Sequence, residues 1–144
     1  MSEGLDLYQE AIKQMAAAAH GQGQLEAASG EATLNNALCG DRVRMQVVLH
    51  DGRIAGIAHQ TRGCLLCRAA ASLLGARAAG LNATELDAAT QTLEAMLKDP
   101  ATASADWPEL AMFRPARAYP SRHKCALLPF HALQAALRAA DAAP

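Results

Sequence analysis

Four cysteines and one aspartate are the residues of this 144-residue chain whose types and spacing point to chemistry. Cys39 and Asp41 lie two residues apart, so their side chains share a face where the backbone is extended. Cys64 and Cys67 form a single CxxC pair, and Cys125 follows near the end of the chain. Thiolates together with a carboxylate suit zinc or an iron-sulfur cluster. The set therefore predicts metal or sulfur chemistry.

The CxxC pair leaves other interpretations open. A cytosolic thiol redox protein that uses Cys64 and Cys67 is one alternative, because a helix N-terminus lowers the pKa of a thiol. A metal-stabilised interaction domain is another. Parallel βαβ units would be expected around a redox pair, whereas the Asp51-Gly52 pair favours an antiparallel hairpin. A zinc ribbon of the usual form is excluded because CxxC occurs only once.

The segment between Asp41 and Cys64 determines how the candidate residues on either side of it meet. Polar and apolar residues alternate from residue 42, as in a half-buried strand. One face carries Val43, Met45, Val47 and Leu49, and the other carries Arg42, Arg44, Gln46 and His50. A type I′ turn at residues 51–52 would return a second strand, over residues 53–61, to the level where the first began. We therefore expect Cys39 and Cys64 at one exposed end of the sheet.

The rest of the chain has helical periodicity. Helices are predicted over residues 5–19, 64–80, 82–98 and 121–140, the last kinked at Pro129, whose ring removes a backbone donor. A short strand is predicted within residues 24–38, a polar connector over 99–106 and a short helical region over 107–113. The prediction is an α+β fold with a small antiparallel sheet packed against several helices. We expect one domain over residues 1–144, with an ordered core of about 5–140.

Charge and composition narrow the function classes. The chain carries 13 basic and 14 acidic residues, so it lacks the basic excess of nucleic-acid-binding proteins. No apolar run reaches the roughly 18 residues of a membrane span, and residues 1–4 lack the basic start of a secretory signal. We therefore expect a cytoplasmic protein with reduced thiols and with neither nucleic-acid nor membrane partners.

Four segments, taken in order, carry the motifs of a known family. They are Leu7-Tyr8-Gln9-Glu10, Asn35-Asn36-Ala37-Leu38-Cys39-Gly40-Asp41-Arg42, Gly63-Cys64 with the small residues Ala69 to Ser72, and Arg122-His123-Lys124-Cys125-Ala126-Leu127-Leu128. Together they resemble the NifU/IscU-like (NifU N-terminal type) iron-sulfur cluster assembly scaffolds over residues 5–137. The closer likeness is to the SufU branch, in which Lys precedes the last cysteine and a longer segment separates the second and third ligands.

The resemblance implies a fold, a site and partners. It implies an IscU/SufU-like fold in which Cys39, Asp41, Cys64 and Cys125 bind zinc, iron or a transient iron-sulfur cluster. Cys125 would accept sulfur from a cysteine desulfurase of the SufS type, with Lys124 as the basic residue beside it. Recipient apoproteins or cluster carriers would take the product. Two mechanisms stay open: a cluster scaffold and a zinc-dependent sulfurtransferase, with the SufU likeness favouring zinc at rest.

Some residues depart from the family or have no assigned role. Ala37 replaces the usual proline, and residues 21–24 replace the usual Asn-Pro-Arg-Asn. Cys67 is an extra thiol, which we expect to be a buried neighbour of the site rather than a fourth ligand. Asp41 is expected to be an exposed turn carboxylate, and His123 an exposed surface residue. No role is predicted for the remaining histidines on helices and strand surfaces: His20, His50, His59 and His131.

Overall fold

The computed structural model describes residues 2–38, 40–99 and 107–142. Its elements are α1 (Ser2–Ala18), β1 (Gly30–Asn36), β2 (Asp41–His50), β3 (Arg53–Arg62), α2 (Leu65–Arg77), α3 (Ala83–Lys98), the 3-10 helix η1 (Pro108–Ala118) and α4 (Pro120–Ala142). Three strands form one sheet in the order β1-β2-β3. The predicted α+β fold, with a small antiparallel sheet and several helices, is confirmed.

The β2–β3 hairpin has the predicted turn. Asp51 and Gly52 have φ angles of 53° and 76°, the left-handed pair that a type I′ turn requires. Both strand pairings are antiparallel, with Asn36 opposite Asp41 and Arg42 opposite Arg62. The end of β1, the start of β2 and the end of β3 therefore lie together at one edge of the sheet.

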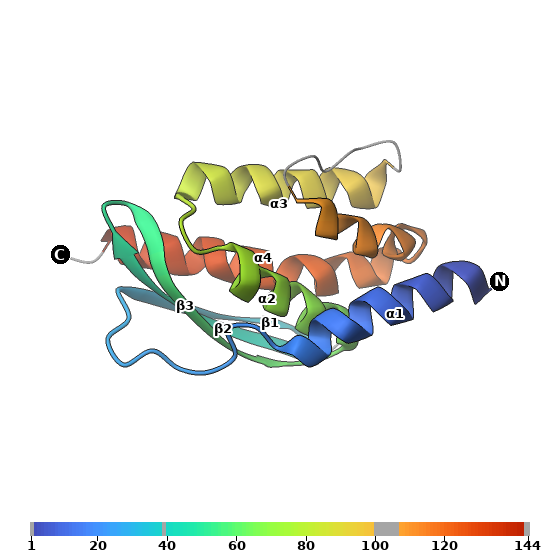
Figure 1. The fold of residues 1–144 in the computed structure, drawn as a ribbon, viewed down its shortest axis with the longest axis horizontal. Coiled ribbons are helices and arrows are strands. Elements are labelled where there is room, and N and C mark those ends of the chain that lie inside the picture. Colours follow the sequence, from blue (N-terminus) through green and yellow to red (C-terminus); the bar gives the residue numbers. More distant parts are fainter. Residues whose placement is uncertain (1, 39, 100–106, 143–144) are drawn as a thin grey trace.

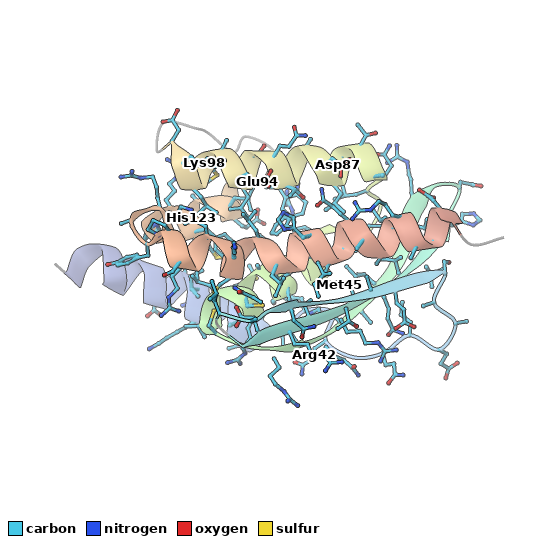
Figure 2. All side chains as sticks on the ribbon, turned by 180° about the vertical axis from the view of Figure 1, so that it is seen from behind. Arg42, Met45, Asp87, Glu94, Lys98 and His123 are labelled. Atoms are coloured by element: carbon cyan, nitrogen blue, oxygen red, sulfur yellow. The ribbon has the colours of Figure 1, made fainter. Side chains whose placement is uncertain are left out.

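The helices lie on one side of the sheet, with α4 running along its inner face (Figure 1). Figure 2 shows Met45 between the sheet and α4, whereas Arg42 points away from the helices. Val43, Met45 and Val47 are fully buried, as their alternation predicts. Gln46 differs from the pattern of a half-buried strand, because it lies on the outer face yet is buried. Its side chain accepts a hydrogen bond of 3.0 Å from the backbone N–H of Leu25, in the segment that crosses that face.

The helix boundaries follow local chemistry. Asn82 and Glu85 form a reciprocal capping box at the start of α3. The predicted region 107–113 is a longer 3-10 helix, and α4 begins at Pro120 and continues past Pro129. Most of the predicted connector, residues 100–106, lies outside the described residues.

His59 differs from its prediction as a surface residue, because its side chain is buried. The backbone of residues 21–23 pairs with β3 at this position and covers the ring. Nε2 donates to the carbonyl oxygen of His20 at 2.8 Å, and Nδ1 accepts from the hydroxyl of Thr61 at 2.9 Å. Burial lowers the pKa of His59 below its ordinary value of 6.5, and the bond to His20 opposes this only in part. The neutral ring therefore ties the end of α1 to the sheet.

We predict that His59 makes folding sensitive to acid. The unfolded chain binds a proton near pH 6.5 that the folded ring resists, so the free energy of unfolding is highest above pH 6.5 and falls below it. The loss is at most about 1.4 kcal/mol per pH unit for this single proton. Urea denaturation at several pH values should show a shallower pH dependence for His59→Gln than for the wild type. Equal slopes would contradict the prediction.

Candidate metal centre

Three of the four sequence-predicted ligands converge in the structure. The carboxylate of Asp41 and the thiols of Cys64 and Cys125 lie within 4.8 Å of one another. They come from three different elements: the first residue of β2, the residue just before α2, and the second turn of α4. The fourth, Cys39, lies outside the described residues. Within the described part of the chain, this is the group of acidic, cysteine and histidine side chains close enough to hold a metal ion.

Asp41 is buried, which corrects the expectation of an exposed turn carboxylate. Only 1% of the residue is exposed. It belongs to β2 rather than to a turn, and α4 packs over β1 and β2 on this face. Oδ1 accepts a hydrogen bond of 2.8 Å from the backbone N–H of Cys64, and Oδ2 lies 3.8 Å from the sulfur of the same residue. Replacing Asp41 therefore removes a buried hydrogen bond as well as a potential ligand.

Cys64 occupies the N-cap position of α2. Its backbone is extended, with φ of −70° and ψ of 169°, and its own side chain makes no capping hydrogen bond. The carboxylate of Asp41 lies instead at this helix terminus, where the partial positive charge of the helix dipole stabilises an anion. The thiol of this partly exposed residue faces Oδ2 of Asp41 instead.

Gly63 permits this close approach of sheet and helix. A methyl group at its Cα position would collide with the carboxylate of Asp41. Its φ of 158° is also one that side-chain-bearing residues seldom adopt. Gly63 thus lets the end of β3 pass the carboxylate closely enough for the Cys64 N–H to reach it.

The other thiols are more deeply placed than Cys64. Cys125 is fully buried, so the site is not the exposed one that we expected. Cys67 is also fully buried within the hydrophobic core and does not belong to the converging group. Among the described cysteines, Cys64, Cys67 and Cys125 form no disulfide. Cys67 is thus buried, as expected.

The two residues before Cys125 are more exposed than Cys125 itself. Lys124 is exposed on α4, one position from the buried sulfur. His123, expected to be exposed, is half-buried, and its Nε2 donates to the carbonyl oxygen of Arg117 at 3.1 Å. This bond ties the start of α4 to the end of η1. His123 is thus held by the fold rather than directed at the thiols.

Asn36 is a residue near the site that the sequence did not single out for a role. It is 8% exposed and lies opposite Asp41 in the strand register, so both side chains share the inner face. Its Oδ1 accepts from the N–H of Leu38 at 3.2 Å. Its buried Nδ2 has no acceptor among the described residues. A buried amide donor beside this group fits a site that receives an anion, such as a thiolate or sulfide.

Residues 7–137 match the family described as the NifU-like N terminal domain. The chain belongs to this family. It is 26% identical over 132 residues to the iron-sulfur cluster assembly scaffold protein IscU of Thermotoga maritima, a match that covers 92% of this chain and 93% of that protein.

Solved structures share the fold. The N-terminal nitrogen-fixing NifU-like protein of Brucella abortus is 30% identical, with a TM-score of 0.87 over 94% of this chain and 95% of that one. A putative iron-sulfur cluster assembly scaffold protein for the SUF system of Fervidobacterium islandicum is 24% identical, with a TM-score of 0.79 and coverage of 92% and 97%. This second likeness concerns the fold alone. Across the described ranges, no helix combines the length and apolarity that spanning a bilayer requires.

We predict that Gly63→Ala breaks the contact between Asp41 and α2. The new methyl group would displace the carboxylate, so the Cys64 N–H would lose its acceptor and the free energy of unfolding should fall by about 2 kcal/mol. Gly52→Ala is the matched control, because Gly52 also has a positive φ but has open space where a methyl would lie. Urea denaturation and the NMR shift of the Cys64 amide should separate the two variants. An unchanged amide shift in Gly63→Ala would contradict the prediction.

Proposed function

We propose that this protein is an iron-sulfur cluster assembly scaffold whose ligands are Cys39, Asp41, Cys64 and Cys125. The observation that carries the proposal is the convergence of one carboxylate and two thiols from the start of β2, the N-cap of α2 and the second turn of α4. Membership of the NifU-like family and the name of the Thermotoga maritima relative support the same function. The cluster is the cargo in this proposal, assembled on the chain and then passed to another protein.

The donor set also fits zinc or iron between rounds of assembly. A tetrahedral zinc ion would place a thiolate sulfur and a carboxylate oxygen about 3.5 Å apart. The sulfur of Cys64 and Oδ2 of Asp41 are 3.8 Å apart, so little movement would be needed. A bound ion would neutralise the clustered anions and link three elements, adding its binding free energy to the stability of the fold. A carboxylate is a harder and more readily exchanged ligand than a thiolate, so it would ease the later release of the bound ion.

Cys125 is the proposed sulfur acceptor. Its thiolate would attack the outer sulfur of a persulfide on a cysteine desulfurase, the sulfur-sulfur bond of the donor would break, and the donor thiolate would leave. The step transfers one sulfur atom without net oxidation. We propose Lys124 as a cation beside this exchange. Because Cys125 is fully buried, a partner must first loosen the packing of α4 against the sheet.

The partners and location follow from this role. We infer a cysteine desulfurase of the SufS type as the sulfur donor, recipient apoproteins or cluster carriers as acceptors, and the cytoplasm as the compartment. We also infer that residues 1–144 act as one domain. A thiol redox function for Cys64 and Cys67 is less well supported, because Cys67 is fully buried and a redox pair needs access to its substrate.

Metal analysis of cysteine variants tests the site. Protein purified without oxygen should contain zinc, or iron with acid-labile sulfide, measured by elemental and sulfide assays. Cys64→Ala and Cys125→Ala should each lose most of this content, because each removes one of the converging ligands. Cys67→Ala is the matched control and should retain it. Iron with sulfide would indicate the scaffold mechanism and stoichiometric zinc the sulfurtransferase, whereas equal loss in all three variants would contradict the assigned ligands.

Sulfur acceptance is tested separately with a cysteine desulfurase and cysteine. Mass spectrometry should show wild-type protein gaining the mass of one sulfur atom, and peptide mapping should place it on Cys125. Cys125→Ser should lose at least about nine-tenths of this label, because a hydroxyl is a far weaker nucleophile than a thiolate. Cys67→Ala serves again as the control. Undiminished labelling of Cys125→Ser would exclude the acceptor role.

A further inference from the structure

Arginines gather on the outer face of the sheet, opposite the helices. The outer-face arginine patch consists of Arg42 and Arg44 on β2 and Arg62 on β3. Figure 2 shows Arg42 directed away from the helical layer. With Gln22, Gln60 and Thr61, these arginines line a hollow of about 430 Å³. The hollow is therefore a strongly basic surface on a chain whose net charge is −1.

Two of these arginines face each other, and within the described residues no acidic side chain neutralises either charge. Arg42 and Arg62 are direct partners in the β2–β3 register, and both are exposed. Like charges directly opposite in a sheet destabilise it. Arg44 differs, because its guanidinium forms an ion pair of 2.8 Å with Glu31. Within the described ranges, neither Arg42 nor Arg62 has an ion pair or a side-chain hydrogen bond. The fold thus retains a repulsive pair that an external anion would relieve.

The patch borders the candidate metal centre. Arg42 follows Asp41 directly, and Arg62 lies two residues before Cys64. Because side chains alternate along a strand, Asp41 points to the buried face while Arg42 points to the outer face. A protein seated on the patch would therefore meet the edge of the sheet where Cys64 is partly exposed.

We propose that the outer-face arginine patch docks a carboxylate-rich surface of the cysteine desulfurase that supplies sulfur. The inference rests on the proposed function and adds the surface and the charge of the partner. Guanidinium groups bind carboxylates through paired hydrogen bonds and are enriched at protein interfaces. Nucleic acid is the poorer fit, because no aromatic side chain lines the hollow for base stacking and the chain has no basic excess.

The test compares two double variants of the full chain with its cysteine desulfurase. Arg42→Gln/Arg62→Gln removes the facing pair, and because it also removes repulsion it should fold at least as stably as the wild type. Lys98→Gln/Arg138→Gln is the matched control, since it removes two exposed cations from α3 and α4. Binding kinetics at low and high salt, metal content and persulfide loading are measured for each protein.

The patch variant should bind the desulfurase about tenfold more slowly at low salt and lose most of its salt dependence, whereas the control should match the wild type. Metal content should be unchanged in both.

Wild-type kinetics in the patch variant, with sulfur still transferred, overturn the docking surface alone. Loss of metal from the patch variant also overturns it, by assigning the arginines to the site. A wild type that neither binds the desulfurase nor accepts sulfur overturns the proposed function and this inference together. Tight, patch-dependent binding of inorganic phosphate or single-stranded DNA would replace the protein partner with that ligand.

Discussion

The hydrogen bond from the Cys64 backbone N–H to the Asp41 carboxylate connects the sheet to α2, and the geometry of the site depends on it. It joins the first residue of β2 to the residue that starts the helix, 23 positions later in the chain. A buried carboxylate is costly unless its oxygens have partners, and this N–H together with the helix terminus supplies them. The same bond fixes where the Cys64 side chain leaves the backbone. The stability of the junction between the sheet and α2 and the placement of the Cys64 side chain therefore depend on the same hydrogen bond.

The two oxygens of Asp41 have different surroundings. Oδ1 is engaged by the backbone, whereas Oδ2 faces the sulfur of Cys64 at 3.8 Å. A metal ion could thus take Oδ2 without breaking the bond that holds α2 in place. Gly63 is part of this arrangement, because any side chain there would press on the carboxylate. The fold accordingly holds this carboxylate in place through a backbone hydrogen bond that needs no ion.

Local sequence signals predicted the elements, and their order along the hairpin predicted that the segment holding Cys39 and Asp41 lies at the same end of the sheet as Cys64. The Asp51-Gly52 turn and the alternation along β2 are short-range features, so one sequence suffices to identify them. The burial of Asp41 and His59 could not be predicted from such short-range features. Asp41 is covered because α4 packs on the sheet, and His59 because the backbone near Gly21 pairs with β3. Both coverings join segments that lie far apart in sequence, which no local pattern encodes.

Burial also constrains how a ligand or cargo could enter the site. Asp41 and Cys125 are almost completely enclosed, and of the three described candidate ligands Cys64 alone is partly exposed. Entry therefore begins at the Cys64 side unless α4 moves. Pro129 has no N–H to donate to the carbonyl of Cys125, so this turn of α4 has one helical hydrogen bond fewer to lose when it shifts. The turn of α4 that carries Cys125 is thus held by one backbone hydrogen bond fewer than a regular helical turn, which lowers the cost of exposing this thiol to a partner.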